Sequence, residues 1–403
     1  MSPRTPPAKR KQERPDAFVI GAGQTRFGEQ WEKSYRDLMT EAGLAAIQDA
    51  GVQGDAIDAV FVGTMSTGKL VGQEHVAPLL LDGAGLADQH IPATRVEAAG
   101  ASGAVAFRQA VQLIRSGSAD IVVVGGIEKM TDVSDADAQA IASAGIDQEW
   151  EHFFGATDAA LHALMAKRHM HEFGTTREQI AQVAVKNHLH GSKNPLAQFR
   201  KPIDLATVLK APFVAEPLTM FDCAPISDGA ACVVLASGAV ASSYRKDPIL
   251  VAGSGQASDS LALHSRPTIT AMRATEQAAR RAYTEAGVSA GDIQLAEVSD
   301  GYTIAEILAI EDLGFVRKGD GGAAVQDGRT TFGGDLPVVN PSGGLKARGH
   351  PAGATGIAQV CEATWQLRGK AEARQVKDAR IALTHNVGGT GATAVVHVLE
   401  APR

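Results

Sequence analysis

The sequence of this chain of 403 residues repeats itself at a period of about half its length. Residues 18–24, FVIGAGQ, recur as residues 250–256, LVAGSGQ, and in both copies an apolar strand runs into Gly-x-Gly. A segment with helical periodicity follows each strand and stops at a glycine, so Gly51 and Gly287 are expected C-terminal caps. Three further pairs of segments keep the same order: 56–63 with 292–299, 101–110 with 354–363, and 120–126 with 380–386. Strands that alternate with helices predict two duplicated α/β halves, with largely parallel sheets buried on both faces.

Residues 127–217 lie between the two halves and do not follow the repeat. They carry six of the 12 histidines, helical segments at 160–171 and 176–190, and an irregular run with three prolines. We interpret them as an inserted loop domain, because insertions on α/β scaffolds commonly form lids or ligand walls. The expected organisation is a disordered basic tail at 1–15, an N-terminal half at 16–126 plus 218–246, the inserted loop domain at 127–217, and a C-terminal half at 247–403.

The charge balance and the cysteines limit the expected partners and compartment. The formal net charge is −7, which gives no electrostatic reason to expect a nucleic-acid partner. The apolar runs are strand-sized and well short of the roughly 18 residues that a membrane helix requires, so no membrane partner is expected. Three cysteines without CxxC spacing are typical of a reduced, cytoplasmic protein. The basic tail lacks the apolar segment of a secretory signal.

Three motifs resemble known kinds of site but are better explained by packing. The segment 21–26, GAGQTR, has arginine where the dinucleotide fingerprint has its last glycine. The His-x-His pairs at 169–171 and 188–190 point about 200° apart on a helix, so no metal site is expected. Cys223 has the chemistry of a nucleophile, but no histidine lies near it in the sequence. A packed structural thiol is the favoured interpretation.

The loop at 340–356, NPSGGLKARGHPAGATG, is the strongest local signal. It holds His350 between Gly and Pro at the mouth of a helix, where the helix N-terminus supplies unpaired N–H donors. A histidine held there can donate to a developing oxyanion or move a proton, and a capping histidine is the alternative. The segment 386–391, NVGGTG, follows the last inner strand. It is expected either to face the crevice beyond the strand ends, where open α/β sheets bind ligands, or to be a plain turn.

Six segments together resemble the thiolase superfamily, most closely its archaeal and sterol-carrier-protein-type acetyl-CoA acetyltransferases. The matching pieces are GIEKM at 126–130, KRHMHEFGTT at 167–176, PISDGAA at 225–231, TIAEILAIEDLGF at 303–315, the Gly-His-Pro loop, and HNVGG at 385–389. The likeness extends from Asp16 to Glu400. It implies an α/β thiolase fold of five layers, αβαβα, whose inserted loop domain forms a wall for coenzyme A. It also implies Claisen chemistry, in which a cysteine takes an acyl group from CoA and two oxyanion holes stabilise the developing charge.

The chain departs from the family pattern at two places. Relatives carry the nucleophile in a segment like VEAACASG, and Gly100 stands at the cysteine position in the VEAAGASG of this chain. The segment that reads His-Asp-Cys/Ala-Phe in this branch is Ser-Asp-Gly-Tyr at 299–302. By the same resemblance, His350 is the retained Gly-His-Pro histidine, and Asn386 stands where other thiolases carry a second cysteine. Gly388, together with Gly100, would supply the N–H groups of the second oxyanion hole.

These matches define an expected site in which some residues move protons and others hold the thioester. The catalytic candidates are His350, Tyr302, Asn386 and Ser299, and the candidates for binding the oxyanion or the substrate are Gly100, Gly388 and Gly301. As a hypothesis, His350 and Tyr302 transfer protons, while Asn386 and the two N–H groups hold the thioester oxygen. Retro-aldolases of this superfamily that shorten steroid side chains are similar in having glycine in the nucleophile region. Their tyrosines match Ser299 and His350 here, so their mechanism does not carry over.

The expected function is an enzyme that acts on acyl-CoA thioesters and forms or cleaves a carbon–carbon bond by Claisen or aldol chemistry, without a cysteine acyl-enzyme. Two alternatives stay open: a non-catalytic acyl-CoA-binding or scaffold subunit, and a conventional acetyl-CoA acetyltransferase. No permanently bound cofactor and no metal is expected, with a coenzyme A thioester as substrate or ligand. The resemblance implies a homodimer or tetramer, with a small zinc-ribbon/OB-fold protein as a further partner.

Overall fold

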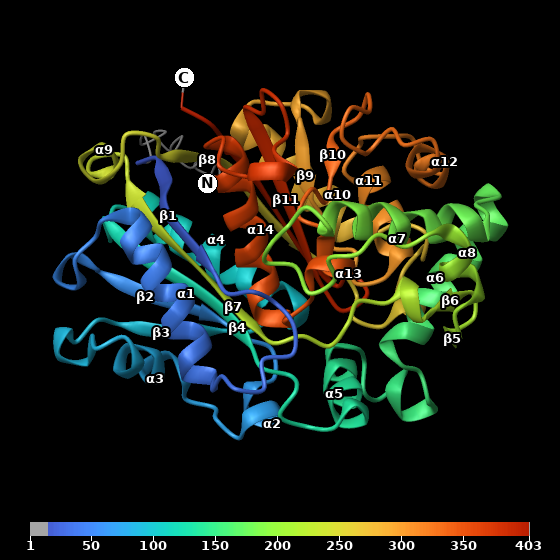
Figure 1. Ribbon diagram of the computed structural model, residues 1–403, viewed down its shortest axis with the longest axis horizontal. Coiled ribbons are helices and arrows are strands. Elements are labelled where there is room, and N and C mark those ends of the chain that lie inside the picture. The colour runs from blue at the N-terminus through green and yellow to red at the C-terminus, as the bar shows by residue number, and fades with distance from the viewer. Residues whose placement is uncertain (1–14, 403) are drawn as a thin grey trace, which may run out of the picture.

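The computed structural model of the chain describes residues 15–402 and places ten strands in one mixed sheet (Figure 1). The strand order is β10-β9-β11-β12-β8-β1-β7-β4-β2-β3. The strands of the N-terminal half are β1 (Ala17–Gln24), β2 (Ala59–Gly63), β3 (Ala93–Val96), β4 (Ile121–Glu128) and β7 (Gly229–Ser237). Those of the C-terminal half are β8 (Ile249–Ser258), β9 (Leu295–Glu297), β10 (Val338–Val339), β11 (Ile381–Gly388) and β12 (Thr393–Glu400). Counted outward from β1 and β8, the two halves have the same order, which confirms the duplication.

The helices form layers around the two halves of the sheet. The helices that matter for the layers are α1 (Tyr35–Ala50), α4 (Ser102–Arg115), α10 (Arg273–Ala286) and α14 (Ala352–Leu367). Helix α1 packs on β1 and β7, and α10 packs on β8 and β12, so these two cover the outer faces. Helices α4 and α14 pack on each other and contact strands of both halves, so they lie between them (Figure 1). This is the expected five-layer arrangement.

The expectation of largely parallel sheets needs a correction. β2 runs parallel to β3 and β4, and β9 runs parallel to β10 and β11. The strands β7 and β12 are antiparallel to both of their neighbours. β12 follows β11 after a turn of four residues, and a connection that short allows only an antiparallel pair. The β1–β8 contact that joins the halves is also antiparallel.

The same close contact between a strand glycine and a helix carbonyl occurs in both halves. A Cβ added at Gly21 in β1 would lie 2.2 Å from Ala46 O in α1. A Cβ added at Gly253 in β8 would lie 2.1 Å from Ala282 O in α10. Only glycine permits this close approach of strand to helix. The Gly-x-Gly motif is therefore a packing device in both copies, as its departure from the dinucleotide fingerprint indicated.

An ion pair is duplicated in the same register. In both copies, an arginine at the end of the inner helix of one half donates to a strand carbonyl of the other half, and it pairs with an acid near the end of that other half's outer helix. That acid also accepts from a strand N–H, and all of these distances are 2.7–3.1 Å. Arg368 of the C-terminal half contacts Val19 and Asp49 of the N-terminal half, where Asp49 also accepts from Ala22 N. Arg115 of the N-terminal half contacts Val251 and Glu285 of the C-terminal half, where Glu285 also accepts from Ser254 N. The predicted caps at Gly51 and Gly287 are also present, with φ of 71° and 69°.

The segment between the halves forms four helices and leads into a small hairpin. The last three helices and the hairpin lie beside the C-terminal half, whereas the first helix contacts α2 (Thr67–Val71) of the N-terminal half (Figure 1). These elements are α5 (Asp135–Ala142), α6 (Asp158–Phe173), α7 (Arg177–Gly191), α8 (Leu205–Lys210), β5 (Phe213–Ala215) and β6 (Leu218–Thr219). Three of the four histidines in the two His-x-His pairs bond to neighbours: His169 contacts Glu311 at 3.1 Å, His188 contacts Lys201 O at 3.3 Å, and His190 contacts Asn340 O at 3.0 Å. His171 is exposed. The expected tail at 1–15 lies outside the described residues except for its last position.

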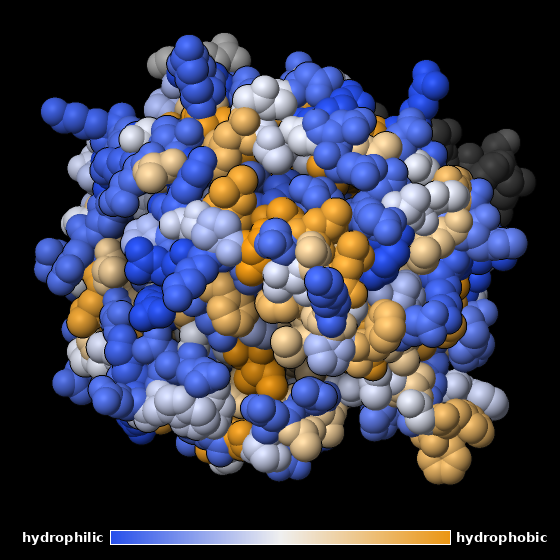
Figure 2. Space-filling model, turned by 45° about the vertical axis from the view of Figure 1, so that its right-hand side comes forward, coloured by the Kyte–Doolittle hydropathy of each residue, from blue (hydrophilic) through white to orange (hydrophobic). Residues whose placement is uncertain are grey.

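Most of the exposed large apolar side chains also belong to this segment. The set is Trp150, Phe153, Phe154, Leu164, Phe173, Leu189, Phe199, Phe213 and Val214. Figure 2 shows apolar residues scattered among polar ones on one face, with a group that projects at its lower right. Within residues 15–402, no helix is both long and apolar enough to cross a membrane.

The remaining helices connect these layers. They are α2 (Thr67–Val71), α3 (Val76–Gly83), α9 (Ala241–Tyr244), α11 (Thr303–Asp312), α12 (Gly321–Gln326) and α13 (Gly344–Arg348). Helix α13 ends directly before the Gly-His-Pro loop, and α14 begins directly after it.

Candidate functional site

Gly100 lies at the entrance to the buried helix α4, where the chain turns in from β3. Ala99 before it adopts a φ of 50°, in the left-handed region that costs a residue with a side chain about 1–2 kcal/mol. Ser102 Oγ donates to Ala99 O at 2.6 Å and stabilises the bend. A Cβ added at Gly100 would lie 2.9 Å from Val387 O and 3.8 Å from His350 Nε2. The bend thus brings Gly100 against the end of β11 and against the Gly-His-Pro histidine.

His350 is held in one tautomer. Its Nδ1 lies 2.7 Å from Thr355 Oγ1, and that hydroxyl donates to Pro351 O at 3.0 Å. Because the hydroxyl proton is directed to the carbonyl, Nδ1 carries the ring proton and Nε2 keeps its lone pair. Burial, with Arg348 as a smaller cause, lowers the pKa of His350 to about 4. At pH 7 the ring is neutral, so Nε2 faces Gly100 as a proton acceptor, which favours proton transfer over donation to an oxyanion.

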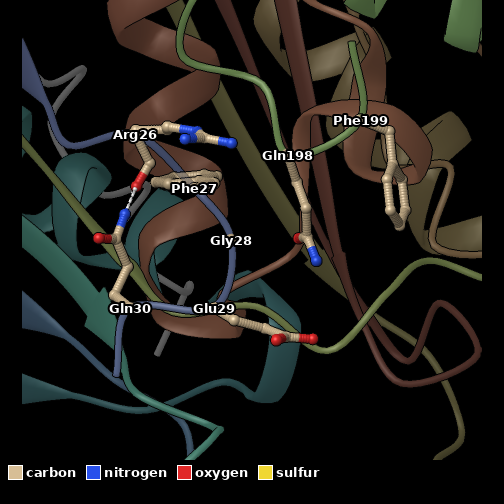
Figure 3. Close-up of a pocket in the computed structure, with 7 residues that line it drawn as sticks. All are labelled: Arg26, Phe27, Gly28, Glu29, Gln30, Gln198 and Phe199. Atoms are coloured by element: carbon tan, nitrogen blue, oxygen red, sulfur yellow. Dashed lines mark hydrogen bonds between the residues drawn. The ribbon is translucent and has the colours of Figure 1, made fainter. Parts of the chain in front are cut away.

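The backbone of His350 is anchored from the opposite side. His350 N donates to Ser227 Oγ at 3.0 Å, and Ser227 Oγ donates to Gln198 Oε1 at 2.6 Å. Gln198 lines a cavity of about 300 Å³ together with residues 26–30 and Phe199. Figure 3 shows the polar ends of Arg26, Glu29 and Gln198 around this space. Its lining residues include neither Gly100 nor His350, so we assign it to the support of the loop and not to the reacting groups.

Ser299 and Asn386 join the ends of β9 and β11. Ser299 Oγ accepts from Asn386 Nδ2 at 3.3 Å and from Val387 N at 3.2 Å, and it donates to His385 O at 3.4 Å. Asn386 Oδ1 has no hydrogen-bond partner within the described part of the chain, and a Cβ added at Gly356 would lie 2.6 Å from it. Asn386 therefore turns its carbonyl toward α14 and one amide hydrogen toward Ser299. One amide hydrogen remains for a ligand.

The backbone after β11 meets the backbone before α4 directly. A Cβ added at Gly388 would lie 2.4 Å from Ala98 O. Such contact is possible only because residue 388 has no side chain. This contact places residues 100 and 388 close to each other in space. The expected second oxyanion hole, which uses an N–H group from each, requires that proximity. The role of their N–H groups stays a prediction.

Tyr302 belongs to a neighbouring cluster. Its ring stacks on His162 of α6 with ring centroids 4.1 Å apart, and its backbone forms an antiparallel bridge with Cys223. Burial, followed by the charges of Asp158 and Cys223, raises the pKa of Tyr302 well above its ordinary value. The phenol therefore keeps its proton at neutral pH. None of the hydrogen bonds or ring contacts found within residues 15–402 joins Tyr302 to His350.

Asp300 and Gly301 separate the two clusters. Asp300 accepts from Leu345 N at 2.6 Å and from Lys346 N at 3.2 Å, so it holds the start of α13. Burial, followed by the charge of Glu306, raises the pKa of Asp300 to about 7. A Cβ added at Gly301 would make only an ordinary contact, at 3.8 Å from Leu345 Cδ2. Packing alone therefore does not require glycine at 301.

All three cysteines of the chain lie away from Gly100. Cys232 is buried in β7, and Cys361 is buried in α14, where its Sγ donates to Gly23 O at 3.6 Å. Cys223 is half-buried and donates to Thr219 O at 3.5 Å, as the interpretation of a packed thiol requires. Burial raises the pKa of Cys223 and of Cys232 to about 12, and raises that of Cys361 as well. None of them is a thiolate at pH 7.

Sequence reasoning missed the residues that orient His350. Thr355 stands five residues after it in the same loop, and Ser227 belongs to a segment that matches the thiolase pattern, so both had a usable signal. Gln198 lies in the irregular part of the inserted segment and carries no signal of its own. The other missed residue is Lys346, which lies buried four positions before His350.

Comparisons with known proteins identify the family of the chain. The family "Thiolase, N-terminal domain" matches residues 17–239, and "Thiolase C-terminal domain-like" matches residues 255–401. An acetyl-CoA acetyltransferase of Methanothermobacter thermautotrophicus is 55% identical over 96% of this chain and 99% of its own length. The benzoylsuccinyl-CoA thiolase subunit BbsB of Thauera aromatica is 36% identical over 92% of this chain and 94% of its own length.

Solved structures show the same likeness. The Ltp2-ChsH2(DUF35) aldolase is 28% identical, has a TM-score of 0.82, and is matched over 96% of this chain and 98% of its own. Human mitochondrial 3-ketoacyl-CoA thiolase in complex with CoA is 18% identical with a TM-score of 0.74, over 96% of this chain and 98% of its own, and shares the fold.

Proposed function

The chain belongs to the thiolase family of acyl-CoA enzymes, and from that membership we propose that it forms or cleaves a carbon–carbon bond beside a CoA thioester without a cysteine acyl-enzyme. One observation carries the proposal. At the entrance to α4, a residue without a side chain faces the unprotonated Nε2 of His350. The site thus has a base that faces the position where the family's acylated thiol would stand.

Conventional acetyl transfer is disfavoured by the same geometry, although the relative from Methanothermobacter thermautotrophicus is named acetyl-CoA acetyltransferase. That chemistry needs a nucleophile to hold the acyl group between two half-reactions. Gly100 offers none, and the three cysteines lie elsewhere with raised pKa values. We expect ping-pong thiolysis to be absent or slower by orders of magnitude.

An aldol cleavage uses the groups that are present. His350 Nε2 accepts the proton of the 3-hydroxyl of a 3-hydroxyacyl-CoA, and the bond between C2 and C3 breaks. C3 leaves as an aldehyde or ketone, and the electron pair forms the enolate of the thioester. The N–H groups of Gly100 and Gly388 stabilise the enolate oxygen. The proton then returns from His350 to C2, which releases the shortened acyl-CoA, and the reverse sequence makes the bond.

Ser299 and Asn386 act in this proposal as positioning residues. Their hydrogen bonds to each other and to Val387 N hold the end of β11, and with it Gly388. The remaining amide hydrogen of Asn386 is available to the thioester oxygen. Tyr302 remains a candidate proton donor for larger substrates, because its phenol stays protonated at neutral pH.

The test compares two reactions on one preparation. Purified protein is given either a 3-ketoacyl-CoA with free CoA, to detect thiolysis, or a 3-hydroxyacyl-CoA, to detect aldehyde or ketone release. We expect release from the hydroxy substrate, loss of release in His350→Phe, and no acyl group on the protein by intact mass spectrometry. Rapid thiolysis with a recoverable acyl-enzyme would overturn the proposal.

A non-catalytic acyl-CoA-binding or scaffold subunit is the second candidate, because Gly100 has no side chain to acylate. The structure of the Ltp2-ChsH2(DUF35) aldolase contains a second protein beside its thiolase-like chain. We propose that this chain also works with a small zinc-ribbon/OB-fold protein, as a homodimer or tetramer in the cytoplasm, with the inserted segment 127–217 as the wall of its CoA site. Acyl-CoA binding without turnover of either substrate, alone and with a purified DUF35 protein, would favour the scaffold.

A further inference from the structure

Lys346 lies on α13, buried with 2% of its surface exposed, four residues before His350. Its Nζ lies over the rings of Phe199 and Phe221, at 5.5 and 5.9 Å from their centroids. Among residues 15–402, no side chain forms a hydrogen bond or an ion pair with this amine. A buried cation without a counterion is costly in a folded protein, so its persistence calls for an explanation.

The acids near Lys346 are already engaged. Asp222 is paired with Arg177 and accepts from Thr303 Oγ1 at 2.9 Å. Asp300 accepts from Asn187 Nδ2 at 2.6 Å, in addition to the two backbone N–H groups of α13. Neither carboxylate is free to serve as the partner of Lys346.

Two of the groups that surround the amine keep some solvent exposure. Cys223 and Tyr302, which are joined by a backbone bridge, are both only partly buried. Burial lowers the pKa of Lys346 to about 8, and Cys223, Asp300 and Asp222 oppose this shift. At pH 7 the amine is therefore mostly a cation, which argues for recognition of an anion and against use as a neutral nucleophile.

His188 is the other titratable group that faces Lys346. Burial, followed by the charge of Lys346, lowers the pKa of His188 to about 4, so it is neutral and supplies no charge. The cluster around the amine is then two aromatic rings, a protonated thiol, a protonated phenol and a neutral imidazole. The two nearby carboxylates, Asp222 and Asp300, have other partners, so the cluster lacks a negative group that pairs with the amine.

We propose that the ammonium of Lys346 binds a carboxylate on the acyl group, so that the preferred substrates are acyl-CoA thioesters that carry a second acid. This inference rests on the proposed function, because it assumes that an acyl-CoA occupies the site. Lys346 N donates to Asp300, and the neighbouring Ser299 bonds to Asn386 and Val387 N of the site, so the amine borders the segment that holds the end of β11. The carboxylate would complete the charge pair, and Tyr302 would border the same space.

The test uses two ligands that differ in one group. Succinyl-CoA and butyryl-CoA both have acyl chains of four carbons, and only the first ends in a carboxylate. Calorimetry at pH 7 should show that the wild type binds succinyl-CoA about tenfold to hundredfold more tightly, the range expected for a hydrogen bond to a charged group. In Lys346→Met this preference should disappear while butyryl-CoA binds within about twofold of the wild type.

The control variant is Lys193→Met, whose amine also lies over a ring, Phe332, at 4.3 Å, and it should keep the preference. The wild type should lose the preference between pH 7 and pH 9, since a pKa near 8 means that the amine gives up its proton there. Equal binding of both ligands by the wild type overturns the inference but leaves the proposed function standing. Binding of neither ligand overturns the proposed function itself. If Lys346→Met does not fold, the wild-type comparison and its pH dependence still decide.

Discussion

Replacing Gly100 with cysteine returns a thiol to the entrance of α4, and we expect the variant to take an acetyl group from acetyl-CoA. The added Cβ would lie 3.8 Å from His350 Nε2, and Sγ extends one bond further, within hydrogen-bonding reach of that nitrogen. Nε2 keeps its lone pair in the tautomer that Thr355 fixes. A base at this position converts the thiol into the reactive thiolate.

The cost of this variant can be worked out from one contact. The new Cβ would lie 2.9 Å from Val387 O, so the end of β11 must move by a few tenths of an ångström. Overpacking of this kind costs about 1–3 kcal/mol, and the loss of glycine freedom in the unfolded chain returns about 0.4–1 kcal/mol. Gly100 is not at a positive φ, so backbone strain adds nothing. The free energy of unfolding should fall by at most about 2.6 kcal/mol, which leaves a folded protein to assay.

The assay is intact mass spectrometry after incubation with acetyl-CoA. Gly100→Cys should gain the mass of one acetyl group and lose it again when free CoA is added. The wild type and Gly100→Ala, which has the same Cβ without a thiol, should stay unmodified. Adding His350→Asn to the cysteine variant should slow acylation by about a hundredfold or more, the usual contribution of a general base. A folded Gly100→Cys that binds CoA but never becomes acylated would refute the geometry described for the site.

Three further outcomes follow from the structure. Thr355→Val should remove the acceptor of His350 Nδ1 and mix the ring tautomers, which nitrogen NMR of the imidazole detects, whereas Thr355→Ser should keep the wild-type spectrum. Gly21→Ala and Gly253→Ala should each lower the free energy of unfolding, measured in urea, by about 1–3 kcal/mol or more, because each added methyl group meets a helix carbonyl. The two decreases should be similar, and a large difference between them would contradict the duplicated packing. Burial lowers the pKa of His397 to about 3, so below pH 6.5 the unfolded chain binds a proton that the folded chain does not, and the urea midpoint should fall as the pH drops from 6.5 toward 3. A midpoint independent of pH over that range would exclude this contribution.

The duplication could be predicted because close packing leaves a pattern in the sequence. Gly21 and Gly253 must be glycine for a helix to cross them, and Gly51 and Gly287 must be glycine to end that helix. Strand direction leaves no such pattern. The direction of β12 depends on the length of the turn that precedes it, and an apolar strand has the same composition in either direction.

The site could be predicted in part for a related reason. Gly100 and Gly388 lie against the backbone of neighbouring segments, with the ring of His350 beside Gly100, and the glycines that permit this approach are visible in the sequence. The position of the Tyr302 side chain could not be predicted in this way, because its contacts are made by the ring and not by the backbone. Its orientation is set by His162 on α6, in the inserted segment that the repeat does not describe. Lys346 was missed because a buried amine is recognised only once its surroundings are known.

Comparing the two copies separates glycine that the fold requires from glycine that changes the chemistry. In the register of the repeat, Gly100 corresponds to Gly353 at the entrance to α14. A Cβ added at Gly353 would lie 2.5 Å from two backbone carbonyls, those of Gly63 and Ile127, so packing excludes every other residue there. At Gly100 only one carbonyl is close, at 2.9 Å, and the next neighbour is the ring of His350. The fold tolerates a side chain at position 100 at a modest cost, so its absence there is best explained by what the site does.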